Sequence, residues 1–469
     1  MIEDRVSSAQ RLLGLCVKIK SLSIMQNLSH LSVLIHEQAK KYGSRPVLTF
    51  RSFGSLKWKT VSWNQFSLRV KQVSNALLNL GIKPQEKIAV FSQNCIQYLY
   101  TDFGAYGIRV VSIPFYATSS ESQIQYMIND AEVKYLFVGE QDQYDKAHRI
   151  FPLCPSLERI IIFDESVRVS SHDPNAIYFE DFLRLGEGLP RQTEVEKRWA
   201  EANEDDVCNI LYTSGTTGAS KGVILNYRQY NAAIIANGKC VGVSDKDRAI
   251  NFLPFTHVFE RGWSYLCLSV GAQLIINTYP KEIQDSMRET HPTCMSSVPR
   301  FWEKVYQAVK AKMDEASGVQ RKLFNHALSV GRRHNIEYLA NGKRPPLALA
   351  LEYKLVNNTV LSIVRKQLGL EHPNIFPTAG AYVSPEVEQF VHSIGITMIV
   401  GYGLTESLAT VSCDRPKQKY TIGSVGRLID GIELKIGEND EILLKGPTIT
   451  PGYYHRDEAN AQSFDKDGF

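Results

Sequence analysis

The sequence has almost no excess of either charge. It contains 53 Lys and Arg residues against 49 Asp and Glu residues, which gives a net charge of +4. It also has no run of basic residues interleaved with aromatic ones. Both features argue against a nucleic-acid partner, because binding to a phosphate backbone needs a concentrated basic surface.

Cysteine is scarce and follows no functional pattern. The eight cysteines show no spacing typical of a metal site or of a redox motif. Several of them, such as Cys208 and Cys267, lie in apolar contexts, where cysteine behaves as a small hydrophobic residue. This usage fits a reducing compartment, and we expect the protein to be cytoplasmic.

Long hydrophobic runs are absent as well. Stretches such as residues 110–115 are short and flanked by polar residues, well below the roughly 20 apolar residues that cross a bilayer. We therefore expect no transmembrane segment. Residues 11–25 superficially resemble a signal peptide, but Lys18 and Lys20 interrupt the apolar stretch. We predict no secretion, and we interpret residues 1–24 as a disordered or artefactual extension.

The most informative segment that is present runs Tyr212-Thr-Ser-Gly-Thr-Thr-Gly-Ala-Ser-Lys221-Gly222. Apolar residues on either side predict two strands joined by this loop. Its glycines allow the backbone to turn several N–H groups toward one point, and its hydroxyls add further donors. The loop therefore predicts a polyphosphate site, with a lysine to neutralise charge. The candidate binding residues are Thr213, Ser214, Gly215, Thr216, Thr217, Gly218 and Lys221.

Two known phosphate-binding patterns do not fit this loop. It lacks the Gly-Lys-Ser/Thr triplet of a Walker A motif, and no dinucleotide fingerprint is present. An ordinary flexible hairpin loop also favours Gly, Ser and Thr. That alternative stays open on this segment alone.

A second glycine-bracketed segment follows the apolar residues 398–400. Gly401 and Gly403 flank Tyr402, and Thr405 and Glu406 come next. A tyrosine can stack on a base, a threonine can donate to a phosphate, and a carboxylate can hold a hard cation such as Mg²⁺.

Together, the two segments resemble the signature motifs of the adenylate-forming superfamily, which includes acyl-CoA synthetases, luciferases and the amino-acid-activating domains of peptide synthetases. The resemblance extends from about residue 30 to the last residue. It implies an α/β fold of two subdomains with mostly parallel sheets plus a small β-barrel subdomain. It also implies ATP as substrate, with Mg²⁺ held by Thr216 and Glu406. Ser220 departs from the pattern, because most members carry proline there; we expect a looser loop without loss of a phosphate contact.

Two further segments resemble the long-chain fatty acyl-CoA synthetase branch. They are Phe-Leu-Pro-Phe-Thr-His-Val-Phe-Glu-Arg-Gly-Trp at 252–263 and Ser-Val-Pro-Arg-Phe-Trp-Glu-Lys-Val-Tyr at 297–306. A helical insertion, which we predict at 303–369, is typical of the same branch. The resemblance implies a long-chain fatty acid:CoA ligase that forms an acyl-adenylate and then a thioester with CoA. An adenylating enzyme for an aryl, medium-chain or amino acid stays open, as does a nonenzymatic binder of nucleotide or acyl chain.

The same resemblance implies roles for individual residues. His257 is a candidate neighbour of the reacting carboxylate, and Trp263 is a candidate gate of an acyl tunnel. Either residue can equally be structural: the run from Trp263 reads as plain core helix too, and Glu260 with Arg261 can form a buried ion pair. The catalytic candidates are Lys221, Thr216, Glu406 and His257. The adenine-binding candidates are Gly380, Ala381 and Tyr382.

Alternating strand and helix patterns predict the domain organisation. We expect a first α/β subdomain over residues 25–205, a second over 206–415 with both nucleotide motifs, and the β-barrel over 416–469. Family members continue into a small mobile domain that carries a catalytic lysine. We therefore expect residues 1–469 alone to be severely impaired in adenylation.

The implied partners are a fatty acid, ATP and CoA. A carrier-protein thiol as acceptor and a homodimer as the oligomeric state both stay open. A weak peripheral association with the inner face of a membrane is compatible with a substrate that partitions into lipid.

Overall fold

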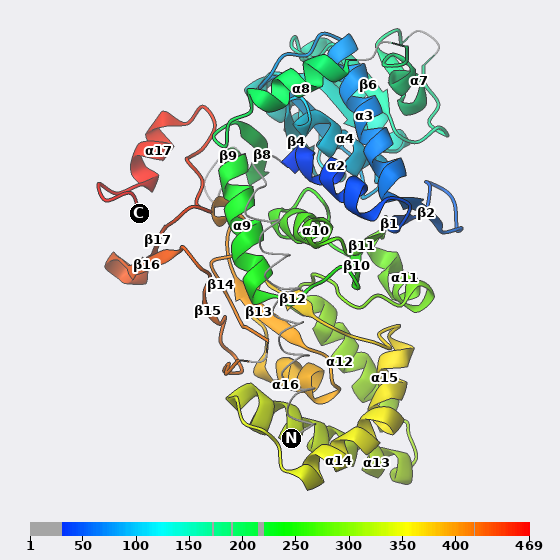
Figure 1. Cartoon of the computed structure of the whole chain (residues 1–469), viewed down its shortest axis with the longest axis vertical. Coiled ribbons are helices and arrows are strands. Elements are labelled where there is room, and N and C mark those ends of the chain that lie inside the picture. The colour runs from blue at the N-terminus through cyan, green and yellow to red at the C-terminus, as the bar shows by residue number, and fades with distance from the viewer. Residues whose placement is uncertain (1–30, 171–172, 189–190, 214–219, 417) are drawn as a thin grey trace, which may run out of the picture.

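The structure is a computed structural model that describes residues 31–170, 173–188, 191–213, 220–416 and 418–469. Its described strands form four sheets, with seven, four, four and two strands. The seven-stranded sheet lies at one end of an elongated molecule, and a group of helices lies at the other end (Figure 1).

The seven-stranded sheet confirms the predicted βαβ alternation. Its strand order is β7-β6-β5-β3-β4-β8-β9, and only β9 runs antiparallel to its neighbour. All residues of β4 are buried, as expected for a parallel strand covered on both faces. The strands are β3 (Lys87–Phe91), β4 (Val111–Phe115), β5 (Val133–Val138), β6 (Arg159–Ile162), β7 (Ala176–Tyr178), β8 (Val207–Thr213) and β9 (Lys221–Asn226).

Two further sheets have four strands each, and the first of them joins segments far apart in the sequence. One has the order β10-β11-β1-β2 and the other β12-β13-β14-β15. Their strands are β1 (Pro46–Phe50), β2 (Lys59–Ser62), β10 (Arg248–Asn251), β11 (Gln273–Ile276), β12 (Phe376–Thr378), β13 (Met398–Tyr402), β14 (Ser412–Cys413) and β15 (Arg427–Leu428).

The sheets do not divide at residue 206, where we expected the second subdomain to begin. Strands β8 and β9 complete the first sheet, whereas β1 and β2 join the later strands β10 and β11. Hydrophobic periodicity identifies a strand but not its partner, so this exchange was not visible in the sequence. The domain boundaries themselves stay a prediction.

The β-barrel expected from residue 416 is not formed by the described residues. Strand β15 pairs with β14, while β16 (Glu433–Ile436) and β17 (Ile442–Lys445) form a separate antiparallel hairpin. These strands are too short and too few to close a barrel.

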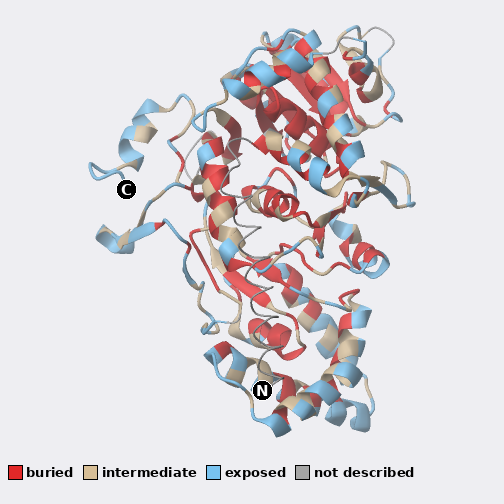
Figure 2. Cartoon of the chain, in the orientation of Figure 1, coloured by how far each residue is buried: buried red, intermediate tan, exposed pale blue. Residues whose placement is uncertain are grey.

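Helices cover the sheets and form the insertion. The first group comprises α2 (Leu31–Tyr42), α3 (Trp63–Asn79), α4 (Ile96–Tyr106), α5 (Glu121–Ala131), α6 (Gln141–Ile150), α7 (Phe179–Arg184), α8 (Gln192–Ala200), α9 (Tyr227–Cys240), α10 (Val258–Val270) and α11 (Ile283–Thr290). The second comprises α12 (Pro299–Asp314), α13 (Gly318–Arg332), α14 (Leu347–Val356), α15 (Ser362–Gln367), α16 (Pro385–Ser393) and the C-terminal α17 (Asp457–Ser463). Helices α12 to α15 occupy the predicted insertion and carry both buried and exposed residues (Figure 2). Most of their buried residues belong to a separate hydrophobic cluster.

One helix of the insertion bears on the expectation that the chain has no transmembrane segment. The continuous helix Leu347–Gln367 is, by length and composition alone, long and apolar enough to cross a membrane. From the sequence we expected no such segment, because the apolar stretches we considered, such as residues 110–115, are short and flanked by polar residues. Leu349 and Val356 point inward and are buried, so this helix is packed on the protein along one side.

Candidate functional site

The predicted phosphate loop joins two strands, as expected. Strands β8 and β9 pair antiparallel, and their register places Lys221 opposite Thr213 at the loop end of the hairpin. A Cβ on Gly222 would lie 2.6 Å from Ile210 Cγ2, so a glycine is needed for this close pairing. The loop candidates Ser214, Gly215, Thr216, Thr217 and Gly218 lie outside the described residues.

A network of side chains supports the end of this loop. The Tyr126 hydroxyl donates to the Ser220 carbonyl oxygen at 3.0 Å. The Asp130 carboxylate accepts from the Tyr212 hydroxyl and from Arg456, each at 2.6 Å. Ser220 is the position where the family pattern has proline, so these hydrogen bonds supply part of the rigidity that a proline ring would give.

A segment near the C-terminus extends the hairpin by one further strand-like pairing. The Ile224 N–H donates to the Gly452 carbonyl oxygen at 3.0 Å, and the Tyr454 N–H donates to that of Gly222 at 2.8 Å. This pairing places the Tyr453 ring 5.1 Å from Lys221 Nζ.

Tyr453 also contacts the second motif. Its hydroxyl donates to Glu406 Oε1 at 2.8 Å, and the Thr450 N–H donates to the Glu406 carbonyl oxygen at 2.7 Å. The sequence analysis missed Tyr453. Its signal was weak, a tyrosine pair after Pro-Gly, and its partners lie far away in the chain.

The second motif follows β13 and is held by backbone geometry. A Cβ on Gly403 would lie 1.8 Å from the Ala409 carbonyl oxygen, so only glycine fits there. Thr405 and Glu406 lie in a short 3-10 turn, which is followed by two residues of positive φ, Leu408 and Ala409. This turn presents the Glu406 side chain toward Tyr453.

The predicted adenine segment lies next to the second motif. Strands β12 and β13 are parallel, with Thr378 opposite Val400, so Gly380 and Tyr402 follow at the same sheet edge. Gly380 has φ +90°, which favours glycine, and the Tyr382 side chain is 75% exposed. Like Gly380 and Tyr382, Ala381 is exposed, which leaves this edge accessible to a ligand.

A cavity of about 740 Å³ joins several of the predicted residues. Thr213, Ser220, His257 and Thr405 all line it. The structure thus brings the ends of the phosphate loop, the histidine segment and the second motif to one place. Their roles in binding stay predictions.

His257 is held in one orientation at the start of α10. Its Nδ1 accepts from the Phe259 N–H at 3.2 Å, which leaves Nε2 to carry the proton in the neutral ring. The ring is accessible from the cavity, but partial burial lowers the pKa of His257 below its usual value. We therefore expect a neutral ring that donates from Nε2.

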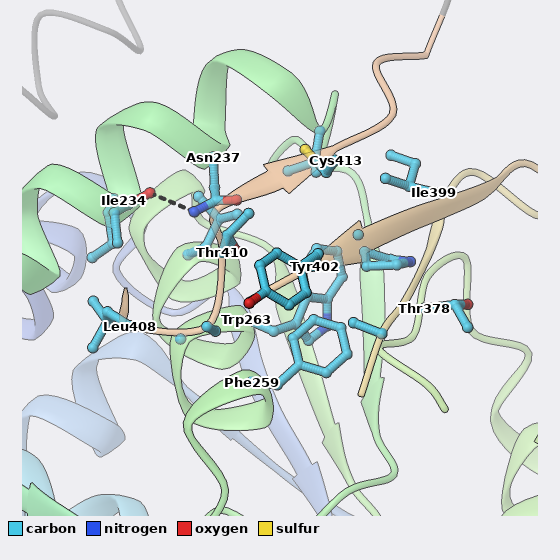
Figure 3. A pocket seen from close by; sticks show the side chains of 18 of the residues that line it. Ile234, Asn237, Phe259, Trp263, Thr378, Ile399, Tyr402, Leu408, Thr410 and Cys413 are labelled. Atoms are coloured by element: carbon cyan, nitrogen blue, oxygen red, sulfur yellow. Dashed lines mark hydrogen bonds between the residues drawn. The ribbon is translucent and has the colours of Figure 1, made fainter. Parts of the chain in front are cut away.

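A second, apolar pocket lies between α9, α10 and β13 (Figure 3). Its volume is about 60 Å³, and Trp263, Leu266 and Tyr402 form part of its wall. The Trp263 side chain is buried, and its Nε1 has no hydrogen-bond partner among the described residues. Tyr402 therefore belongs to the second motif and also lines the apolar pocket.

The proposed ion pair between Glu260 and Arg261 is wrong. Successive residues of a helix do not face each other. Arg261 instead pairs with Asp102 at 2.7 Å, and both side chains are only 1% exposed. Glu260 accepts from Asn251 at 2.7 Å and from Ser296 at 2.6 Å, and burial raises its pKa to about 7.

The AMP-binding enzyme family matches residues 35–454 of the chain. The chain belongs to this family. Relatives of the AMP-binding enzyme include the long-chain-fatty-acid–CoA ligase ACSBG2 of Xenopus laevis, which is 26% identical over 93% of this chain and 59% of its own length. The ligase ACSBG1 of Mus musculus is 24% identical over 93% of this chain and 61% of its own length. The chain thus spans about three-fifths of these relatives.

Solved structures show the same fold for this AMP-binding enzyme. A long-chain-fatty-acid–CoA ligase, FadD1, from Archaeoglobus fulgidus superposes with a TM-score of 0.66 at 18% identity, covering 94% of this chain and 80% of that one. The A-PCP didomain of carboxylic acid reductase from Segniliparus rugosus, in complex with AMP, superposes with a TM-score of 0.72 at 20% identity. That match covers 96% of this chain and 64% of the reductase chain. The mixed α/β fold with mostly parallel sheets is therefore confirmed.

Proposed function

We propose that the complete protein is an ATP-dependent long-chain fatty acid:CoA ligase. The observation that carries the acid-activating part of this proposal is the apolar pocket at Trp263, because it shares Tyr402 with the edge that carries the nucleotide motifs. A carboxylate at the mouth of such a pocket lies beside a bound nucleotide. The names of the ACSBG relatives support the same substrate class.

In the first half-reaction, a fatty acid carboxylate attacks the α-phosphorus of ATP, and pyrophosphate leaves. A carboxylate is already ionised at neutral pH, so this step needs positioning and charge neutralisation rather than a general base. Lys221 neutralises phosphate charge, and neutral His257 orients the substrate carboxylate by a hydrogen bond from Nε2. The thiol of CoA then displaces AMP.

The residues fit a Mg²⁺ ion, the metal that the family implies. Magnesium in nucleotide sites is usually held by one or two carboxylates together with substrate phosphates and water. Within the described ranges, no three His, Cys, Asp or Glu side chains form a dedicated metal site. Glu406 uses Oε1 for Tyr453, and its Oε2 has no hydrogen bond among the described residues. Thr216, which lies outside them, is predicted from the sequence alone to add a hydroxyl. When bound, the ion would neutralise charge on the phosphates.

The small volume of the pocket favours a second candidate, an enzyme that activates a shorter or an aryl acid. A volume of about 60 Å³ holds only a few water molecules. A long acyl chain would therefore need the Trp263 side chain to move aside. A short or planar acid would need less displacement.

Substrate profiling of the complete protein distinguishes the two candidates. Pyrophosphate release is measured with ATP, Mg²⁺ and one acid at a time, namely palmitate, octanoate, benzoate or mixed amino acids, each with and without CoA. Turnover that rises with chain length and with CoA supports the long-chain ligase. Turnover with benzoate or octanoate alone supports the second candidate, and no turnover with any acid supports a nonenzymatic binder.

A further inference from the structure

The helical insertion carries an exposed line of apolar side chains. Leu347, Leu351, Leu355 and Ile363 are 77%, 60%, 66% and 58% exposed. They recur every four residues with Thr359 between the last two, and we call these five residues the apolar stripe. The stripe lies on α14 and α15, at the end of the molecule away from the seven-stranded sheet (Figure 1).

A π-helical turn keeps the stripe on one face. Positions spaced by four drift around an α-helix, because it has 3.6 residues per turn. The turn Asn357–Leu361 is π-helical and has more residues per turn, which limits this drift. Ile363 therefore stays on nearly the same side of the helix as Leu355.

The threonine of the stripe, Thr359, is compatible with an apolar surrounding. The Thr359 hydroxyl donates to the Leu355 carbonyl oxygen at 2.8 Å, so its hydrogen-bonding need is met within the helix. The Ser362 hydroxyl likewise donates to the Asn358 carbonyl oxygen at 3.0 Å. Burying this face in an apolar medium would leave neither hydroxyl donor unsatisfied.

Unpaired basic side chains accompany the stripe. Lys343, Arg344, Lys354 and Lys366 are exposed, and none of them forms an ion pair within the described part of the chain. The acidic Glu352 is already engaged, 3.2 Å from His326 Nε2 and 3.9 Å from Arg333. The face is thus apolar along its centre and positively charged around it.

We propose that the apolar stripe lies on the surface of an anionic phospholipid bilayer. Leucines beside lysines and arginines on one helix face are the pattern of an interfacial helix, with the apolar side chains in the acyl region and the cations at lipid phosphates. The stripe is about 24 Å long at 1.5 Å per residue. Lying in the membrane plane, it would bring the protein to the phase in which long-chain acids concentrate.

The helix lies on the bilayer rather than crossing it. Its inner side is packed on the protein, where Leu349, Val356 and Leu361 are buried. The Arg365 guanidinium donates to the Ile394 carbonyl oxygen at 2.7 Å. Spanning the bilayer would expose these groups and break that hydrogen bond.

Vesicle flotation tests the proposal without ATP, CoA or fatty acid, so its outcome is independent of the ligase assignment. The wild-type protein should bind vesicles of mixed phosphatidylserine and phosphatidylcholine. The double variant Leu351→Asp with Leu355→Asp should bind about tenfold less, because two leucines no longer enter the acyl region. The matched control is Leu56→Asp, an 84% exposed leucine outside the stripe, which should bind as the wild type does.

The charge component is tested separately. The double variant Lys343→Glu with Arg344→Glu should lose the preference for phosphatidylserine and the weakening of binding by salt. Circular dichroism should show an unchanged fold for all variants, because the altered side chains point to solvent. An alkaline carbonate wash should release the bound wild-type protein.

Three results would overturn the proposal. The first is that the Leu351→Asp, Leu355→Asp variant binds vesicles as well as the wild type does. The second is that the wild-type protein stays on the vesicles after the alkaline wash. The third is that the wild type does not bind vesicles but forms a dimer, and that this double variant is a monomer. The last result would assign the stripe to a second copy of the chain.

Discussion

The Tyr453 hydroxyl donates a 2.8 Å hydrogen bond to Glu406, and the ring of the same tyrosine lies 5.1 Å from the Lys221 ammonium. One side chain thus connects the lysine of the phosphate hairpin with the carboxylate of the second motif. Its position depends on the backbone pairing of residues 452–454 with β9. We infer that Tyr453 positions Glu406 for the metal and the phosphates.

Replacing Tyr453 by phenylalanine tests this positioning role. The ring over Lys221 stays, but Glu406 loses its hydrogen bond. We expect the rate of acyl-adenylate formation to fall about tenfold, and the Mg²⁺ concentration for half-maximal rate to rise, because a loss of roughly 1.4 kcal/mol corresponds to tenfold. Tyr454→Phe is the matched control, since the ring of Tyr454 stacks on His455 and its hydroxyl makes no hydrogen bond within the described residues. Equal Mg²⁺ dependence in both variants would contradict the role.

Replacing Trp263 by alanine should widen the apolar pocket. We expect kcat/KM to increase for longer acids relative to shorter ones, by about fourfold for each methylene newly buried at about 0.8 kcal/mol. Competition between octanoate and palmitate measures this shift directly. Trp199→Ala, a partly buried tryptophan on α8, serves as the control. If the Trp263 variant keeps the chain-length preference of the wild type, Trp263 does not determine which acids the pocket accepts.

The buried pair of Asp102 and Arg261 should matter for stability far more than a surface pair of the same length. Asp102→Asn leaves the Arg261 charge without its carboxylate, and we expect a loss of about 3–5 kcal/mol in the free energy of unfolding. Asp142→Asn removes the equally short 2.7 Å pair with Lys146, where the aspartate is 63% exposed, and should cost at most about 1 kcal/mol. Urea denaturation of both variants measures the difference. Equal losses would show that burial does not set the strength of these pairs.

Glu260 should make the stability depend on pH. Its folded pKa of about 7 lies above the ordinary value of 4.5, so between these values the carboxyl binds a proton in the folded state and not in the unfolded state. This group therefore lowers the free energy of unfolding as pH rises from 4.5 to 7, by roughly 3 kcal/mol in total. Glu260→Gln should remove this contribution to the pH dependence of the free energy of unfolding. The exposed control Glu438→Gln should leave the pH dependence unchanged. The free energy of unfolding is measured at several pH values across this range. The same dependence on pH in the wild type and in Glu260→Gln would show that Glu260 does not cause it.

Local features of the fold were predictable from the sequence, and long-range partners were not. The two strands predicted on either side of the phosphate loop form β8 and β9, because the apolar pattern that marks a strand is local. Strand β1 pairs with β11, more than two hundred residues further along the chain, and β8 pairs with the earlier strand β4. These pairings could not be read from local sequence. Likewise, Arg261 was assigned to its neighbour Glu260, whereas its partner Asp102 is 159 positions away.

The same distinction applies to the site. The motifs predicted that Thr213 and Thr405 bind the nucleotide and that His257 lies near the reacting carboxylate, and the structure places all three in the wall of one cavity. Tyr453 belongs to no motif that the sequence analysis used. It reaches Lys221 and Glu406 only because a distant segment pairs with β9, which no local pattern records.

Acyl-adenylate formation by the complete protein tests the central claim most directly. Exchange of labelled pyrophosphate into ATP is measured with palmitate and Mg²⁺, with Lys221→Ala as the inactive control. The account predicts palmitate-dependent exchange in the wild type that falls at least about a hundredfold in the variant, because Lys221 stabilises the departing pyrophosphate. Absence of exchange with palmitate, or exchange that Lys221→Ala leaves unchanged, would contradict it.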